Sequence, residues 1–349
     1  METLNIKNYF FFIASFVVIM AGVKMASEVV VILFLAIFIS SILSFVLDTL
    51  KNRGVPKLFA YFLLLLILTF LFFVFSYVVN ISLKDFISNF PSYEAKLRSL
   101  VLSSVDLAHS YGLEIDRAKI ISMLDFNYFF GFTKNLIGGI SLFLSKFLLV
   151  VIGVAFILSE TKSFQTKLKV IFRNNIKQLE HFNLFSTNIQ KYFIVKSFTS
   201  FLTGFIIAIM LIIFGVDYPI LWGVIAMLFN FVPVVGSIIA AVPAVLLAFM
   251  SLDIVLVSWV IIFYLVINIS ISNILEPKLM GKELGLSPLV IFFSLIFWGY
   301  ILGIVGMFLA VPITMTFKIA FDSNKNTKWI GILMSNLSKK RDKKENYKI

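Results

Sequence analysis

Long apolar runs separated by short charged loops occupy most of this chain and constrain its fold more than any other feature. Six runs have a length suited to one membrane span, at 8–24, 28–48, 57–80, 137–159, 192–214 and 254–275. A spanning helix needs about 20 mainly apolar residues. With 60% hydrophobic and 14% charged residues, the chain has more apolar surface than a soluble core could bury. The sequence therefore predicts an all-α, polytopic membrane protein.

The first apolar run raises the question of a cleaved signal peptide. Tyr9 to Ala21 follow Lys7 and resemble the apolar region of a signal sequence. A second apolar run begins by Val29, and the segment between the two runs has no convincing cleavage site. We interpret the first run as an uncleaved transmembrane helix. Glu28 lies at the start of the second run, Lys24 lies just before it, and both are expected to reach the membrane interface.

Two hydrophilic stretches interrupt the apolar pattern. The stretch at 81–135 has six basic and six acidic residues, and its apolar positions from Phe86 to Val105 recur every three or four residues. This pattern predicts a small amphipathic helical domain outside the membrane. The stretch at 160–191 is mainly basic and is typical of a cytoplasmic connector. Lys146 falls inside the fourth run, so we expect that helix to begin later than residue 137.

The distribution of lysine and arginine orients the chain, because cytoplasmic loops carry an excess of both. The loop at 49–57 holds three basic residues and no acidic one, and nine Lys or Arg residues follow from Lys318 onward. Both observations place the N- and C-termini in the cytoplasm. The same rule explains the net charge of +12 without nucleic acid, which we do not expect as a partner.

Two further apolar blocks, at 219–250 and 288–317, are too long for one comfortable span and too short for two. Proline and glycine interrupt both, and broken backbone survives in a bilayer only where protein or a cavity satisfies it. We expect each block to fold back as a re-entrant hairpin, hairpin 1 from outside and hairpin 2 from inside. The alternative is a pair of long single spans. The hairpins would complete eight apolar segments, about six of them spanning.

Five segments follow from these patterns. They are transmembrane helices 1–3 (1–80), the extracytoplasmic domain (81–135), the fourth helix with the basic connector (136–191), a transport core with both hairpins (192–317) and a basic tail (318–349).

Opposed broken hairpins suggest transport, because helix ends inside a bilayer leave backbone groups that can hold a solute. The predicted pathway residues are the polar, glycine and proline positions of the core: Asn230, Pro233, Gly236, Ser237, Pro243, Asn268, Asn273, Glu276, Pro277, Gly281, Gly299, Gly303, Gly306 and Pro312. The polar residues of 254–275 could equally serve helix packing. Glu276 could carry a cation or proton, or simply pair with Lys278 or Lys282.

Several function classes lack their usual residues. The chain has no cysteine, no Walker A loop, no His-Glu-x-x-His pair and no Gly-x-Ser-x-Gly elbow. His109 and His181 lie in separate hydrophilic stretches and form no ligand set. We therefore predict no enzyme activity, no catalytic residue, no metal site and no cofactor.

Three sequence pieces resemble the autoinducer-2 exporter family of PerM-like permeases. They are Leu221-Trp222-Gly223 through Asn230-Phe231-Val232-Pro233 to Pro243, then Asn273-Ile274-Leu275-Glu276-Pro277 with Leu284-Gly285-Leu286-Ser287-Pro288, and finally Gly299, Gly303, Gly306 and Leu309-Ala310-Val311-Pro312. Many members have His where this chain has Ser287. The resemblance implies an inner-membrane transporter and a homo-oligomer, and it leaves the solute open.

Three functions follow as hypotheses. The first is a secondary transporter that moves a small organic solute, such as an autoinducer-2-like signal, across the lipid bilayer. The second is a sodium–proton antiporter, which the scarcity of carboxylates in the predicted core disfavours. The third is a membrane scaffold that assembles through residues 81–135 without transport.

Overall fold

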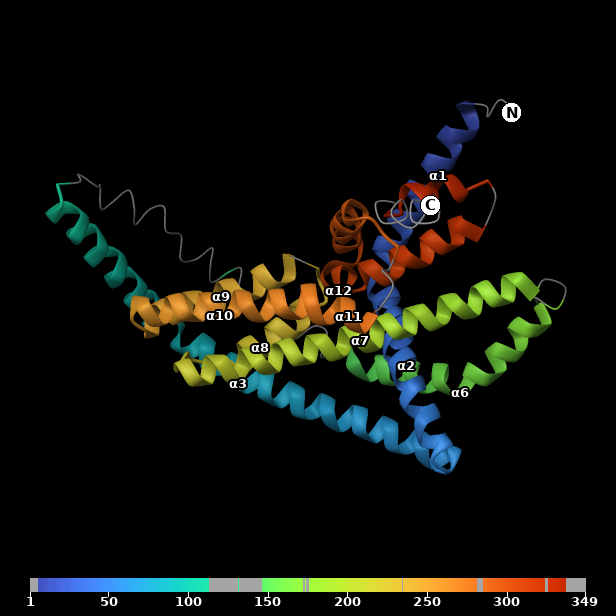
Figure 1. The fold of residues 1–349 in the computed structure, drawn as a ribbon, viewed down its shortest axis with the longest axis horizontal. Helices are drawn as coiled ribbons and strands as arrows, with labels where there is room; N and C mark the ends of the chain where they lie inside the picture. Colours follow the sequence, from blue (N-terminus) through green and yellow to red (C-terminus); the bar gives the residue numbers. More distant parts are fainter. Residues whose placement is uncertain are drawn as a thin grey trace, which may run out of the picture. The chain divides into compact units, whose positions relative to one another are not determined.

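The structure, a computed structural model, describes residues 6–112, 131, 146–171, 173, 176–233, 235–280, 285–323 and 326–336. Every regular element among these residues is a helix (Figure 1). The elements are α1 (Ile6–Met25), α2 (Ser27–Asn52), α3 (Lys57–Ser110), α6 (Phe147–Ile171), α7 (Ile176–Phe214), α8 (Pro219–Phe229), α9 (Val235–Ser251), α10 (Ile254–Ile269), the π-helix η1 (Ser270–Leu275), α11 (Glu276–Met280), α12 (Pro288–Ser323) and α13 (Lys328–Leu333).

Many of these helices have the length and composition of membrane spans. Within the described ranges, five qualify by length and composition alone: Ser27–Asn52, Lys57–Ser110, Ser186–Phe214, Ile254–Met280 and Pro288–Ser323, the last of which reverses direction within its length. Shorter apolar helices occupy Ala14–Met25, Phe147–Thr161, Pro219–Phe229 and Val235–Ser251. The predicted all-α, polytopic membrane fold is therefore confirmed.

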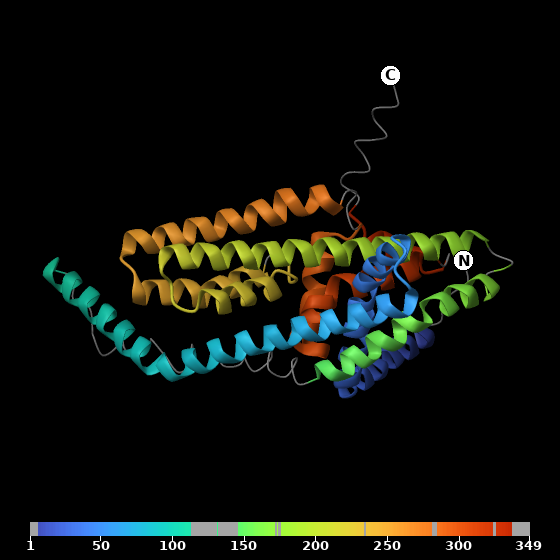
Figure 2. The same cartoon turned by 90° about the horizontal axis from the view of Figure 1, so that it is seen from below.

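The helix α3 extends beyond its predicted span. It continues past residue 80 as far as Ser110, with Pro91 inside it, and Figure 2 shows its second half turning in direction. Phe86, Phe90, Tyr93 and Val105 are buried on this second half, as their spacing predicted. Apart from Gly131, residues 113–135 of the predicted extracytoplasmic domain lie outside the described residues, so the domain boundaries stay predictions. The helix α6 begins at Phe147, and Lys146 precedes it as expected.

The chain forms two compact units, and each has its own core. Unit 1 comprises Met1–Leu65, Leu148–Ile194 and Met280–Ile349, and unit 2 comprises Leu66–Phe147 and Val195–Leu279. The first contains α1, α2, α6 and α12, whereas α8, α9 and α10 belong to the second, together with the later residues of α3 and α7.

Unit 1 is held together by close helix crossings and a few long-range hydrogen bonds. Gly153 of α6 faces the Cβ atom of Ala36 on α2 so closely that a Cβ at residue 153 would lie 2.9 Å from it. The Tyr61 hydroxyl donates to the carbonyl oxygen of Leu158 at 2.7 Å. The ammonium group of Lys24 lies 3.3 Å from the ring centroid of Tyr300, so its charge interacts with an aromatic face.

Unit 2 has one hydrophobic core that α3, α7, α8, α9 and α10 share. Trp222 of α8 is fully buried and meets the ring of Phe86 edge-on, with 5.5 Å between ring centroids. Gly204 of α7 and Gly223 of α8 let the two backbones approach closely, because a Cβ on either would collide with the carbonyl oxygen of the other. Small residues allow such crossings in membrane proteins. Figures 1 and 2 show α10 running beside the later part of α7.

Both interrupted blocks fold back on themselves. In hairpin 1, α8 and α9 pack against each other on either side of a tip at 230–233. In hairpin 2, which is α12, the chain reverses at Gly303, whose φ of 69° and ψ of −152° are not helical. Trp298 Nε1 donates to Thr314 Oγ1 at 3.1 Å, although an unbroken helix would separate these residues by about 24 Å. The alternative of long single spans is therefore wrong for the fold of both blocks.

Candidate functional site

The tip of hairpin 1 is an irregular turn that satisfies its own backbone. Pro233 has no N–H and cannot continue α8, so the helix ends at Phe229. The N–H of Val232 donates to Phe229 at 2.9 Å, and that of Gly236 donates to Val232 at 3.2 Å. These bonds meet the requirement for broken backbone inside a bilayer.

Gly236 is a structural requirement of this tip. A Cβ atom at this position would collide with the carbonyl oxygen of Phe229 at the end of the first arm. Hairpin 2 repeats the arrangement, because a Cβ at Gly306 would collide with the carbonyl oxygen of Trp298. In both hairpins, a glycine on the returning arm allows it to lie directly on the backbone of the first arm.

A buried polar face of α7 lies against the tip of hairpin 1. Asn230 is only 4% exposed, and its side-chain amide donates to the Ser200 hydroxyl at 3.0 Å. Thr203 and Thr199 are also buried, and the Thr203 hydroxyl donates to the Thr199 carbonyl at 2.8 Å. Buried polar groups in a spanning helix are costly, so they usually mark a functional surface.

An ion pair completes this face one turn away. Lys196 Nζ donates to Oε1 and Oε2 of Glu276 at 3.0 and 2.8 Å, and the two side chains are 4% and 16% exposed. The expectation that Glu276 pairs with Lys278 is wrong, because its carboxylate bonds to Lys196 instead and Lys278 is exposed. The other expected partner, Lys282, lies outside the described residues. The fold thus brings a lysine that is 80 residues away in the sequence into contact with the carboxylate.

The backbone around Glu276 is a π-helix with a local cause. Pro277 supplies no N–H, so the carbonyl of Asn273 four residues earlier lacks its α-helical donor. The chain adopts the wider turn from Ser270 to Leu275, and the Glu276 N–H donates to Ile271, five residues back. Such π-turns occur frequently at functional sites. Here the turn directly precedes the carboxylate that meets Lys196.

A second polar network lies at the end of hairpin 1 opposite its tip. The Asp217 carboxylate accepts hydrogen bonds from the Tyr93 hydroxyl at 2.8 Å and from the Ser251 hydroxyl at 3.3 Å. Trp222 Nε1 donates to the Asp217 carbonyl at 3.1 Å. Tyr218 has a left-handed backbone with φ of 56°, which is strained for a residue with a side chain. The network ties α3 to the start and the end of hairpin 1.

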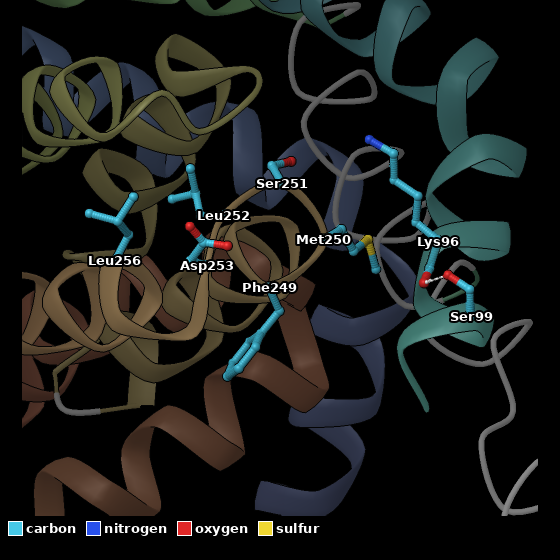
Figure 3. Close-up of a pocket in the computed structure, with 8 residues that line it drawn as sticks. All are labelled: Lys96, Ser99, Phe249, Met250, Ser251, Leu252, Asp253 and Leu256. Carbon is cyan, nitrogen blue, oxygen red and sulfur yellow. Dashed lines mark hydrogen bonds between the residues drawn. The ribbon is translucent and has the colours of Figure 1, made fainter. Parts of the chain in front are cut away.

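A pocket of about 370 Å³ opens beside this network (Figure 3). Lys96 and Ser99 of α3 form one wall, and the turn from α9 to α10 forms the other, with Ser251 between Lys96 and Asp253 in the view. The remaining lining residues are mainly apolar: Phe249, Met250, Leu252 and Leu256. The pocket has the volume of a small-molecule site and offers both charge signs and hydroxyl groups.

The predicted pathway residues divide between the two units. Unit 2 contains those of hairpin 1 and of the segment after it, namely Asn230, Pro233, Gly236, Ser237, Pro243, Asn268, Asn273, Glu276 and Pro277. Unit 1 contains those of hairpin 2, namely Gly299, Gly303, Gly306 and Pro312. Gly281 lies outside the described residues. Asn230, Gly236, Pro243, Gly306 and Pro312 are buried, whereas Asn273, Pro277 and Gly303 are exposed.

Sequence reasoning missed the α7 half of the site. Lys196, Ser200 and Thr203 follow one another at intervals of four and three residues, which places them on one helix face. A lysine with this polar periodicity in an otherwise apolar run was the available signal. The partner of Lys196 lies 80 residues further along the chain, so no local pattern could show that Lys196 pairs with Glu276.

Broken hairpins and a buried polar face within an all-α membrane chain are features of secondary transporters. The comparisons with known proteins agree with this class. The chain belongs to the AI-2E family transporter family, whose model matches residues 13–326. It is therefore a multi-pass membrane transporter of a small solute.

Two of the relatives match over nearly the whole of both chains, and a third matches over one third of each. A Haemophilus influenzae protein is 34% identical over 342 residues, covering 96% of this chain and 98% of its own. The AI-2 transport protein TqsA of Escherichia coli is 29% identical over 337 residues, with 97% and 98% covered. The YrrI protein of Bacillus subtilis is 39% identical over 116 residues, which is 33% of each chain.

Proposed function

We propose that this chain is a secondary transporter that exports a small organic solute of the autoinducer-2 type past the tip of hairpin 1. The observation that carries the proposal is the buried polar face at this tip, where Asn230 meets Ser200 and Lys196 meets Glu276. Burying polar and charged groups within a membrane is energetically costly, and such groups beside a broken helix commonly mark the pathway of a polar solute. The name of the relative TqsA supports the choice of solute.

The charges at the site favour a neutral solute over a cation. Glu276 is the best-placed carboxylate for sodium or proton binding, and Lys196 neutralises it through both oxygens. Binding a cation would require the carboxylate to leave a buried ammonium group unpaired, which costs several kcal/mol. The antiporter hypothesis is therefore the less favoured one, and the relatives named as transport proteins also disfavour an enzyme.

We infer that the pocket between α3 and the α9–α10 turn is the extracytoplasmic opening of this pathway. It lies where α9 ends, at the opposite end of hairpin 1 from the tip, and its hydroxyl and charged groups suit a polar solute. The orientation of the chain in the bacterial inner membrane follows from its charges, with both termini and the loop around Lys282 cytoplasmic. Hairpin 1 then enters the bilayer from outside and hairpin 2 from inside. The transporter is a homo-oligomer, as the family resemblance implies, without a nucleic-acid partner.

Transport by purified protein in proteoliposomes tests the function. Labelled autoinducer-2 is offered in one arm, and a sodium gradient with an internal pH dye in the other. We expect solute flux in the first arm that falls at least about tenfold in Asn230→Ala, which loses the hydrogen bond to Ser200. Flux in the sodium arm alone would identify the antiporter, and none in either would favour the scaffold.

A cysteine scan tests the orientation. The chain has no cysteine, so single introduced thiols report their own accessibility. Lys282→Cys should react with a membrane-impermeant maleimide only after the cells are opened, whereas Lys96→Cys should react in intact spheroplasts. The reverse pattern would refute the proposed topology, and native mass spectrometry of the purified protein counts its subunits.

A further inference from the structure

One buried polar group of unit 2 takes no part in the contacts described so far. Tyr264 of α10 is 2% exposed, and its hydroxyl has no hydrogen-bond partner within the part of the chain that the structure describes. Native proteins rarely leave such a group unpaired, and each exception requires an explanation. We propose that the Tyr264 hydroxyl contacts the transported solute and contributes to its recognition, an inference that rests on the function proposed above.

The depth of Tyr264 matches that of the hairpin 1 tip. The hydrogen bond from Ser251 to Asp217 brings the start and the end of hairpin 1 to the same level, and α10 begins directly after this point. Asn230 follows Pro219 by eleven residues, and Tyr264 follows Asp253 by eleven. Each helix rises about 16 Å over that interval. With the outer ends of both helices at the membrane surface, as proposed above, both side chains lie near the middle of a hydrocarbon layer about 30 Å thick.

The surroundings of Tyr264 connect it to the hairpin. It belongs to the same buried cluster as Phe229 at the tip and Ala240 and Ala244 on α9. One turn further along, the Asn268 side-chain amide donates to the Tyr264 carbonyl at 2.9 Å. The Tyr264 hydroxyl thus lies in a mainly apolar cluster, at the level inferred for the polar tip.

The chemistry of the hydroxyl indicates the class of ligand. A phenol donates one hydrogen bond and accepts others while it stays neutral, so it suits a small uncharged solute with hydroxyl or carbonyl groups. Without a solute, the buried hydroxyl has lost its hydrogen bonds to water and gained none in return, which costs free energy. A solute that bonds to this hydroxyl removes that cost, so the bond adds to the free energy of binding.

The test separates a binding role from a structural one. Tyr264→Phe keeps the ring and removes only the hydroxyl. Since the hydroxyl bonds to no described group, the thermal midpoint in detergent should stay unchanged or rise, while KM for labelled autoinducer-2 in proteoliposomes should rise on the order of tenfold. Tyr61→Phe is the matched control, because the Tyr61 hydroxyl donates to Leu158 at 2.7 Å. That variant should lower the midpoint and leave KM unchanged.

Each result has a distinct meaning. A Tyr264→Phe protein with the KM of wild type, or with a midpoint lowered as in Tyr61→Phe, overturns the inference and leaves the transport function standing. No autoinducer-2 flux by the wild-type protein overturns both. A raised KM with an undiminished midpoint supports the contact.

Discussion

Lys196 and Glu276 lie 80 residues apart in the sequence, yet one ammonium group bonds to both oxygens of the carboxylate, at 3.0 and 2.8 Å. The pair joins α7 to the residue that directly follows the π-helix. Removing two charges from water costs several kcal/mol per ion, which mutual attraction offsets only while both are present. The pair therefore makes the position of α11 depend on α7.

Breaking this pair from one side should destabilise the protein strongly. Lys196→Met leaves Glu276 buried without its partner, and we expect a loss of about 3–5 kcal/mol. The double variant Lys196→Met with Glu276→Leu removes both charges and should regain most of that stability. Thermal unfolding of the detergent-purified proteins measures both. Equal midpoints for the single variant and wild type would show that the pair contributes little.

A methyl group at Gly236 should disrupt the tip of hairpin 1. The added Cβ would collide with the carbonyl oxygen of Phe229, and a backbone atom can yield only if the turn shifts. We expect Gly236→Ala to lose about 1–3 kcal/mol of stability and most of its transport. Gly22→Ala is the matched control, since nothing lies within 4 Å of its added Cβ. The idea fails if both variants transport like wild type.

The fold of hairpin 2 can be tested by a disulfide in this cysteine-free chain. A Cβ at Gly299 would lie 2.8 Å from the side chain of Met307, whereas an unbroken helix would separate the two residues by about 12 Å. A disulfide requires Cα atoms within about 7 Å. The double variant Gly299→Cys with Met307→Cys should therefore oxidise readily, as mass spectrometry of alkylated protein would show. Free thiols after oxidation would contradict the reversal at Gly303.

The network around Asp217 should stabilise the outer end of hairpin 1. Tyr93→Phe removes a hydrogen bond to a carboxylate, which is worth about 1.5–3 kcal/mol. The control is Tyr111→Phe, because that side chain is 81% exposed. Differential scanning fluorimetry should show a lower midpoint for the first variant alone. A similar midpoint for both would assign Asp217 no structural role.

Sequence patterns predicted the backbone better than the contacts. Pro233 and Gly303 mark the reversals because proline and glycine act locally, on the hydrogen bond or dihedral angle of their own residue. The apolar period of the later part of α3 likewise predicted which of its residues are buried. These are properties of short windows, which a single sequence contains.

The side-chain partners depend on packing that no window contains. Glu276 has lysines two and six residues away, and the sequence pattern pointed only to these as its partners. Likewise, the bond from Asn230 to Ser200 requires α7 and hairpin 1 to lie side by side, which depends on Gly204 and Gly223. The hydroxyl of Tyr264 appears as one more polar atom in the sequence, and only burial shows that it is unpaired.

The short first arm of hairpin 1 has a consequence for biogenesis. With 11 residues, α8 measures about 16 Å, half the thickness of the hydrocarbon layer, so it cannot be inserted during synthesis as a span of its own. The Asn230 side chain at its tip bonds to Ser200 of α7, which leaves the ribosome earlier, whereas the core of unit 2 also requires α10, which leaves later. We therefore expect hairpin 1 to insert into the bilayer after its neighbours, as a late step of assembly.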